Sequence, residues 1–230
     1  MKDHNAHTPE LLRRKLLQLS ALVEENARRC VLAIRSRDWH AARSVIEVDH
    51  EIDEIEIGIE EDCISMLQAR NLDDAEIQFV VAVLKINADL ERIGDLAANV
   101  AGRVLSIGQH DQLVLPNELM TLAERTTVML KHSLDALVNM DPVLAREVCV
   151  RDQEVDQLNR AMYDLVRDRI LASPPQTERL IHLLSISRYL ERMADYATNI
   201  AENVVYVAEG RIIRHRRSDQ LGEIHSEKDR

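Results

Sequence analysis

Apolar side chains recur at intervals of three and four residues along almost the whole chain, which is the spacing of amphipathic α-helices. The pattern predicts six long helices, at about residues 9–35, 38–71, 74–107, 117–139, 142–171 and 176–208. Thr8 followed by Pro9 is a typical start for the first of them. The segment GQHDQLVLP, at residues 108–116, breaks the pattern between the third and fourth helices, and we expect a domain boundary there.

The second half of the chain repeats the first. LERIGDLAANVA at residues 90–101 returns as LERMADYATNIA at 190–201, with seven of the twelve positions identical, and VDHEIDEI at 48–55 corresponds to RDQEVDQL at 151–158. A unit of three helices has the size to bury its own core. We therefore predict an all-α protein of two tandem, internally repeated three-helix bundles, at residues 1–108 and 117–210, followed by a basic and polar C-terminal tail at 211–230.

Composition supports this fold and narrows the function. Of 230 residues, 46% are hydrophobic, and only 6 are glycine and 5 proline, which favours a helical protein with a sizeable core. The aromatic content of 3% and the net charge of −11 argue against a nucleic-acid-binding surface. Cys30, Cys63 and Cys149 lie far apart in apolar helical runs, which indicates free thiols in a reducing compartment. The first residues do not resemble a signal peptide and no apolar run reaches the length of a membrane span, so we expect a cytoplasmic protein.

The repeated segments keep their acids while their apolar residues change. Glu91 and Asp95 are four residues apart and therefore lie on one helix face, as do Asp49 and Asp53. If the second and third helices form a hairpin centred on residue 72, Asp53 is level with Glu91 and Asp49 with Asp95. A hairpin centred between residues 173 and 174 gives the same arrangement in the second half, with the acids Asp152, Asp156, Glu191 and Asp195.

Four carboxylates that converge from two helices repel one another unless protons or a cation lie between them. We favour polyvalent metal ions that prefer oxygen ligands, such as magnesium, manganese, calcium or iron, and Asn99 and Asn199 are placed to add amide oxygens one turn further along. The predicted metal ligands are Asp49, Asp53, Glu91, Asp95, Asn99, Asp152, Asp156, Glu191, Asp195 and Asn199. The simpler alternative is that these acids form solvated helix faces. Arg92 and Arg192 are either supporting partners of the acids or plain surface cations.

These motifs resemble the PhoU family, regulators of bacterial phosphate uptake. Glu-Arg-Ile-Gly-Asp at 91–95, Glu-Arg-Met-Ala-Asp at 191–195 and the Asp-xxx-Asp pairs carry the resemblance, which covers nearly the whole chain. Met193 and Ala194 depart from the usual Ile-Gly. The resemblance implies two three-helix bundles, a homodimer and multinuclear metal clusters. It also implies negative regulation of the phosphate-starvation response through the ATPase subunit of the phosphate transporter and a sensor histidine kinase, and hence a membrane-peripheral position through partners.

Two other classes of function stay open. In a structural helical adaptor, the acids would be a docking surface without functional metal. A carboxylate-bridged di-metal oxidase would need Glu-x-x-His on two helices, but only residues 47–50, Glu-Val-Asp-His, fit that pattern. No nucleophile or phosphate-binding glycine loop is recognisable, so we predict a protein that is not an enzyme. The segment RIIRHRR at 211–217 is either solvated or a contact for an acidic partner or anionic lipid.

Overall fold

The computed structural model describes residues 8–68, 72–108 and 114–210. The predicted tail at 211–230 and most of the predicted central break therefore lie outside the described residues. The structure confirms the six predicted helices, each within a few residues of the predicted ends, together with one short 3₁₀ turn, η1 (Pro174–Gln176). They are α1 (Pro9–Ser36), α2 (Trp39–Gln68), α3 (Asp74–Gly108), α4 (Asn117–Asn139), α5 (Pro142–Ala172) and α6 (Thr177–Glu209).

Short polar side chains fix where several helices begin. The Thr8 hydroxyl accepts a hydrogen bond from the Leu11 amide at 3.2 Å, and Asp141 accepts from two amides at the start of α5. Asp73 and Glu76 form a reciprocal capping box, in which each carboxylate accepts from the amide of the other residue, at 2.8 and 3.0 Å. These caps satisfy amides that have no partner inside the helix, so the helix starts are set locally by the sequence.

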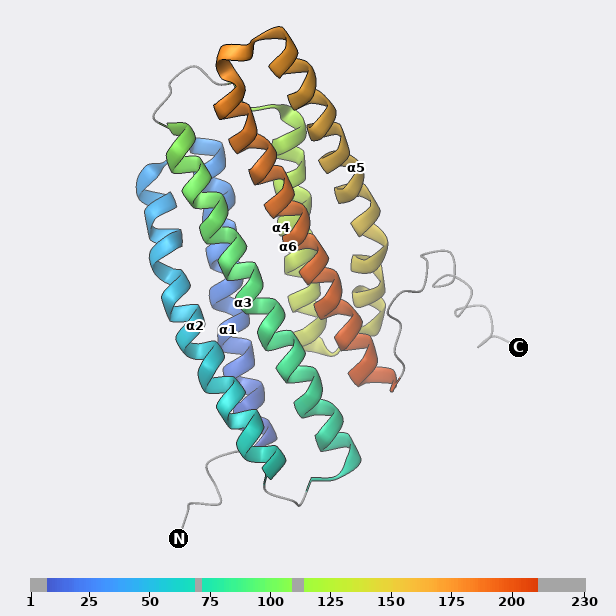
Figure 1. Cartoon of the computed structure of the whole chain (residues 1–230). Coiled ribbons are helices and arrows are strands. Elements are labelled where there is room, and N and C mark those ends of the chain that lie inside the picture. The colour runs from blue at the N-terminus through green and yellow to red at the C-terminus, as the bar shows by residue number, and fades with distance from the viewer. Residues whose placement is uncertain (1–7, 69–71, 109–113, 211–230) are drawn as a thin grey trace, which may run out of the picture.

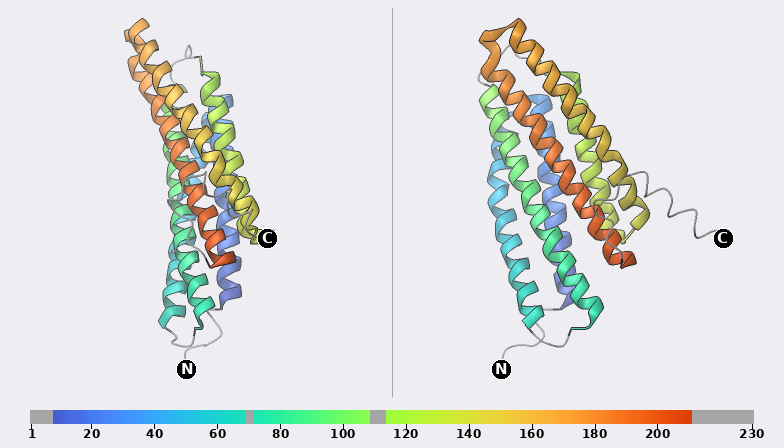
Figure 2. Two further views of the ribbon diagram at one scale, coloured as in Figure 1. Left: turned by 90° about the vertical axis from the view of Figure 1, so that its right-hand side faces the viewer. Right: turned by 45° about the vertical axis from the view of Figure 1, so that its right-hand side comes forward.

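The helices form two three-helix bundles, α1–α3 and α4–α6, and the bundles lie side by side. Helices α3 and α6 are central and antiparallel, and α2 and α5 lie on the outer flanks (Figures 1 and 2). Asn199 of α6 reaches Asp89 of α3, while Arg103 lies beside His182, which confirms the antiparallel direction. On the opposite side α1 packs against α4, where Arg35 pairs with Glu124.

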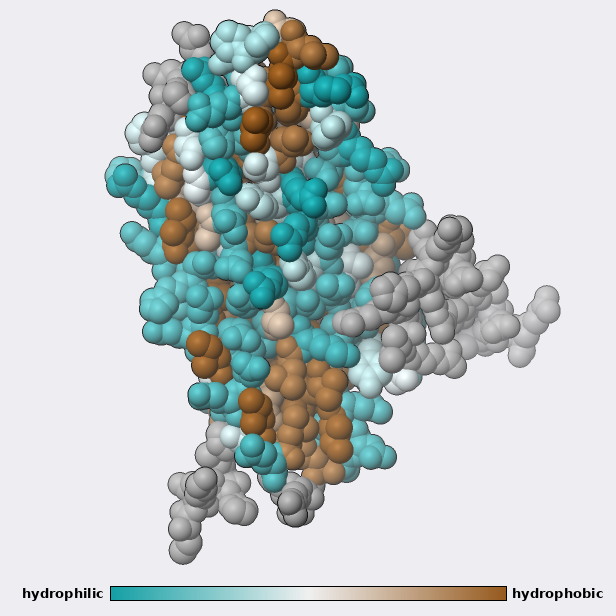
Figure 3. Space-filling model, in the orientation of Figure 1, coloured by the Kyte–Doolittle hydropathy of each residue, from teal (hydrophilic) through white to brown (hydrophobic). Residues whose placement is uncertain are grey.

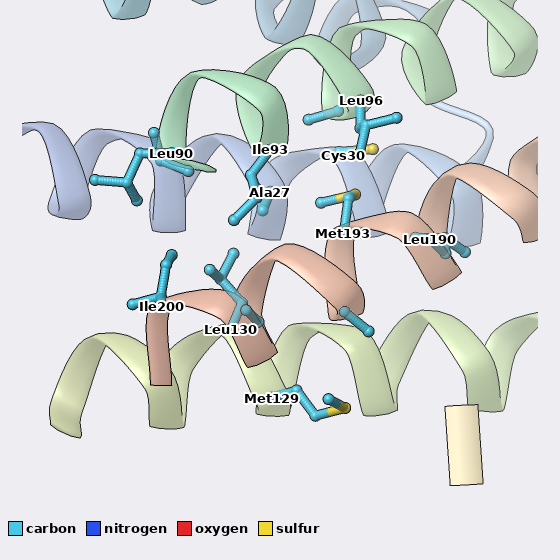
Figure 4. Packing of buried hydrophobic residues seen from close by; sticks show 14 of the residues in the cluster. Ala27, Cys30, Leu90, Ile93, Leu96, Met129, Leu130, Leu190, Met193 and Ile200 are labelled. Atoms are coloured by element: carbon cyan, nitrogen blue, oxygen red, sulfur yellow. The ribbon is translucent and has the colours of Figure 1, made fainter. Parts of the chain in front are cut away.

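The two bundles share one aliphatic core. Buried side chains continue from one bundle into the other through the contact of α3 with α6 and of α1 with α4. Met193 of α6 points toward Cys30 of α1 and Leu96 of α3 (Figure 4). The unusual methionine of the second motif therefore fills space between the bundles, where an unbranched, flexible side chain can adapt. Among the described residues no helix is both long and apolar enough to span a membrane.

An ion pair between a nearly buried arginine and an exposed glutamate ties the start of α5 to the end of α6. The Arg146 side chain is only 12% exposed, its Nη2 lies 2.5 Å from Glu209 Oε2, and its Nη1 donates to the Pro142 carbonyl oxygen at 3.3 Å. Because Glu209 stays in contact with water, the pair contributes through its hydrogen bonds and through the packing of the arginine.

We expect Arg146→Met to lower the free energy of unfolding by about 1–1.5 kcal/mol, because the ion pair with Glu209 and the hydrogen bond to the Pro142 carbonyl oxygen are lost. Arg151→Met on the same helix is the control, since Arg151 is more exposed and lies 3.8 Å from Glu147. That change should stay within about 0.5 kcal/mol of the wild type. Urea denaturation followed by circular dichroism measures both, and equal effects of the two substitutions would contradict the assignment.

Candidate functional site

Four carboxylates face one another between α2 and α3. Asp49 and Asp53 come from α2 and Glu91 and Asp95 from α3, and we call them the first acidic cluster. Loss of hydration between the helices, followed by the charges of Asp95 and Asp53, raises the pKa of Asp49 to about 6. Burial and the charge of Asp95, among others, also raise the pKa of Glu91. The charges therefore act on one another across the two helices, as the predicted hairpin register requires.

Asp49 lies close to the backbone of α3 at Gly94. A methyl group in place of the Gly94 hydrogen would lie 3.2 Å from Asp49 Oδ1 and 3.0 Å from Ile52 Cδ1. The missing side chain at Gly94 thus lets the carboxylate approach the helix. Asp49 Oδ1 is buried there without a hydrogen-bond partner among the described residues. A buried carboxylate oxygen of this kind requires an explanation, and an ion is one of them.

The second acidic cluster, between α5 and α6, consists of Asp152, Asp156, Glu191 and Asp195. Loss of hydration, followed by the charges of Glu191, Asp152 and Asp156, raises the pKa of Asp195 to about 7. Burial and the charges of Asp156 and Glu191 likewise raise the pKa of Asp152. Asp152 Oδ1, the counterpart of Asp49 Oδ1, is also buried and lacks a hydrogen bond of good geometry within the part of the chain that the structure describes, although the Thr198 hydroxyl is close enough to oppose the rise in the pKa of Asp152. The same unsatisfied oxygen therefore occurs at the equivalent position of both repeats.

The two arginines of the repeated motif play different roles. Arg92 lies 3.2 Å from Asp95 Oδ2 and 3.3 Å from Glu91 Oε2, so it partly compensates the first acidic cluster. Arg192 instead donates to the Tyr196 hydroxyl at 3.4 Å. In the second acidic cluster Arg160 of α5 pairs with Asp156 at 3.2 Å. The first cluster is therefore paired with an arginine of α3 and the second with an arginine of α5, while the charges of Arg188 and Arg192 oppose the rise in the pKa of Glu191.

The two predicted asparagines engage other groups through their amide nitrogens. Asn99 Nδ2 donates to the Asp95 carbonyl oxygen at 2.8 Å, within α3. Asn199 Nδ2 donates to Asp89 Oδ1 at 3.5 Å, across to the other bundle. A ligand role for their amide oxygens stays a prediction, and Asn199 also contributes to bundle packing.

Sequence reasoning missed one polar pair in each bundle, which lies about one helical turn nearer to the hairpin connection than the acidic cluster does. Asn87 Nδ2 donates to Glu56 Oε1 at 2.8 Å, and the Ser187 hydroxyl donates to Asn159 Oδ1 at 2.6 Å at the equivalent place in the second bundle. Burial, followed by nearby acids, raises the pKa of Glu56. The two pairs match each other, but each lies one residue off the hairpin register that relates the acids, which would pair Glu56 with Ala88 and Asn159 with Arg188, so that symmetry alone would not have found them.

The side chains of both clusters suit a hard cation, because such ions prefer carboxylate oxygens as ligands. One oxygen in each cluster is also buried and unsatisfied. Over the described ranges, however, no three aspartate, glutamate, histidine or cysteine side chains converge closely enough to hold one ion in this arrangement. Mutual repulsion and the pairing of Asp95 and Asp156 with arginines keep the side chains apart. Metal binding at these positions therefore requires side-chain rearrangement, which these half-exposed groups can make.

His50, the histidine that fits the oxidase pattern, lies outside the first acidic cluster. The His50 side chain is 82% exposed, and its Nε2 lies 3.6 Å from Glu54 on the outer surface of α2. It is therefore directed at solvent and contributes no ligand to the first acidic cluster.

In buffer that contains a metal chelator, we expect the melting temperature of the protein to fall as the pH rises from 5 to 8. Asp49 and Asp195 have pKa values of about 6 and 7 in the fold, against about 4 when unfolded, so their stabilising effect is complete below about pH 4 and is lost as the pH rises through 6 and 7. Arg28 and Arg29 hold the pKa of Glu25 at about 2, so its contribution is constant in this window.

Differential scanning fluorimetry should show a decrease of about 2–4 °C, allowing for solvent screening. Asp49→Asn combined with Asp195→Asn should flatten the profile. An unchanged slope in that variant would mean that other groups cause the pH dependence.

Comparison with known proteins places both bundles in one family. A family profile for the PhoU domain matches the chain twice, at residues 16–104 and 119–204. The chain is 31% identical over 208 residues to the phosphate-specific transport system accessory protein PhoU homolog of Pseudomonas aeruginosa, covering 90% of this chain and 86% of that protein. It is 29% identical over 214 residues to the homolog of Aquifex aeolicus, covering 93% and 97%.

Two solved structures have the same fold. The crystal structure of PhoU from Pseudomonas aeruginosa superposes with a TM-score of 0.85 and 29% identity, covering 88% of this chain and 97% of that one. The phosphate transport system regulatory protein PhoU from Streptococcus pneumoniae gives a TM-score of 0.78 and 29% identity, covering 89% and 97%. The likeness therefore extends over both three-helix bundles and the way they pack.

Proposed function

The chain belongs to the PhoU family, and on this basis we propose that it is an accessory protein of a phosphate-specific transport system. It restrains phosphate uptake and the phosphate-starvation response under phosphate-replete conditions. The observation that carries the proposal is the match to the PhoU domain in both repeats, together with relatives named for that transport system.

The protein acts by contact with other proteins rather than by catalysis. Its functional groups are two clusters of carboxylates on the outer helix pairs, with arginines at their rims, and this inventory suits a binding surface. Its partners are the ATPase subunit of the phosphate transporter, a sensor histidine kinase and a second copy of the chain in a homodimer.

Metal ions organise the two acidic surfaces. Asp49, Asp53, Glu91 and Asp95 hold the ions of the first bundle, and their counterparts hold those of the second. Bound iron or another hard divalent cation supplies positive charge that several carboxylates share. The unsatisfied oxygens of Asp49 and Asp152 support this assignment because they occur at equivalent positions.

One observation favours the adaptor alternative without functional metal. Arg92 already contacts both acids of its own motif, so part of the negative charge is compensated by the protein itself. In that case the acids are docking groups for a basic partner, and the metal content of the purified protein decides between the two interpretations.

Copurification tests the proposed contacts. We expect an affinity-tagged chain, crosslinked in phosphate-replete cells, to recover the transporter ATPase subunit and the sensor kinase, and to recover less of them after phosphate starvation. An untagged strain is the control for background binding. Recovery of neither protein under either condition would refute the proposed partners.

A further inference from the structure

An apolar surface covers the lower ends of α2 and α3 (Figure 3). In these segments Ile64 and Leu67 of α2 and Ile77 of α3 are exposed, and Val81 and Leu84 of α3 are half-buried. We call these five residues the lower apolar face. Their spacing of three, four and seven residues puts the members from each helix on one side of it. Contiguous apolar side chains at a protein surface normally mark a contact.

Helix α6 ends beside this face and leaves it uncovered. Lys85 Nζ of α3 lies 5.8 Å from the ring centroid of Tyr206, and α6 ends just beyond, with Gly210 as its C-terminal cap. Because α3 and α6 are antiparallel, one further turn of α6 brings Gly210 to about the level of Val81. The φ angle of 67° at Gly210 ends the helix there. The chain therefore leaves α6 next to the lower apolar face.

The following segment has a composition that complements this surface. Residues 211–217, RIIRHRR, combine two isoleucines with four arginines and no acid. Ile212 and Ile213 match the apolar side chains, and the arginines match the acids that flank the face at the end of α2 and the start of α3. Those acids are the exposed Glu60, Glu61, Asp73 and Asp74 and the half-buried Glu76.

The segment is long enough to reach across the face. Seven extended residues span about 23 Å, whereas the distance along α3 from Ile77 to Leu84 is about 10 Å. Attachment at Gly210 also gives the segment a high local concentration at this surface, so modest contacts suffice. On α5, Val143 and Val150 are also exposed near Gly210, but Glu147 lies between them and the apolar area there is smaller.

We propose that residues 211–217 dock on the lower apolar face of the same chain. Ile212 and Ile213 cover the apolar side chains, and the arginines pair with the flanking acids. The proposal does not depend on the proposed function, since it concerns a contact within the chain.

Disulfide trapping tests this contact in the full chain. The background is Cys149→Ser, because Cys30 and Cys63 are buried. One protein carries His215→Cys with Ile77→Cys, and the control carries His215→Cys with Val143→Cys. Ile77 and Val143 are 42% and 52% exposed, and the ion pair of Arg146 with Glu209 keeps Val143 near the end of α6 as well. Both pairs therefore have a similar tether, and docking is what distinguishes them.

We expect the disulfide between positions 215 and 77 to form at least ~10-fold faster than the disulfide between positions 215 and 143. The faster disulfide should form within one chain, at a rate that does not depend on protein concentration. Ile212→Asp with Ile213→Asp should abolish the difference. Leu221→Asp with Ile224→Asp, which adds the same charges further along the tail, should leave it unchanged. A further protein carries Leu67→Cys in place of Ile77→Cys, and it tests whether the substitution of Ile77 itself disrupts the lower apolar face.

Three outcomes would overturn the proposal. Equal rates at positions 77 and 143 would mean that the segment does not dock. A faster reaction at position 143 would place it on α5. A disulfide to position 77 that forms only between chains, at a rate that rises with protein concentration, would mean that a second copy occupies the face.

Discussion

Replacing both Asp95 and Asp195 by alanine is expected to remove most of the metal from the purified protein. Each aspartate interacts through its charge with the half-buried aspartate of the partner helix, Asp95 with Asp49 and Asp195 with Asp152. Removing it leaves an incomplete set of carboxylates in each cluster, and hard cations bind weakly to one or two oxygens in water. The wild type should carry more than one metal equivalent per chain after purification without chelator.

Elemental analysis by mass spectrometry measures the metal content directly. The matched control is Glu54→Ala with Asp164→Ala, which removes the same charge from exposed positions outside both acidic clusters. The control should keep the wild-type metal content. If the Asp95 and Asp195 variant retains as much metal as the control, the assigned ligands are wrong and the adaptor interpretation gains support.

Deletion of the protein from its own cell is expected to derepress phosphate-scavenging genes while phosphate is abundant. A chromosomal variant with alanine at all four motif acids should reproduce most of that derepression if metal organises the docking surface. The reason is that the variant loses the charges on both helix pairs at once, although its shared aliphatic core is untouched. The four acids are Glu91, Asp95, Glu191 and Asp195.

A reporter gene for the phosphate-starvation response, assayed in phosphate-rich medium, gives the measurement. The matched control replaces four exposed acids outside the clusters, Glu51, Glu54, Asp164 and Asp168. Immunoblotting must show equal protein levels in both strains. A fully repressed reporter in the clean deletion would refute the regulatory function, whereas repression in the four-acid variant alone would refute only the role of the clusters.

The sequence predicts most of the secondary structure, and it predicts that the acids of neighbouring helices face one another, because both features depend on local rules. Helical periodicity and caps such as Thr8 set the helix limits, and a short connection fixes the register of a hairpin, so Asp49 and Asp95 are level. The contact of α3 with α6 depends on packing between residues about 80–110 positions apart, and no local pattern encodes it.

The side-chain contacts of the repeated motifs were also outside the reach of sequence reasoning. Arg92 and Arg192 occupy the same place in the motif, each after a glutamate, yet Arg92 contacts carboxylates and Arg192 contacts Tyr196. Position 96 is Leu in the first copy, where the second has Tyr196, so the available partner differs. Such differences arise from the residue one turn further along the helix and from the other bundle.

The antiparallel contact of α3 with α6 has the form of a two-fold interface. In a homodimer of a single repeat, the same helix of each copy would pack against its symmetry partner in this way, and every contact would occur twice. Here the contact of Asn199 with Asp89 has no second copy, because the position equivalent to Asp89 is Tyr189. Because the two repeats belong to one chain, their contacts need not be symmetric. The two acidic clusters can therefore differ in the residues around them, as the contacts of Arg92 and Arg160 with their clusters show, while the shared core is kept.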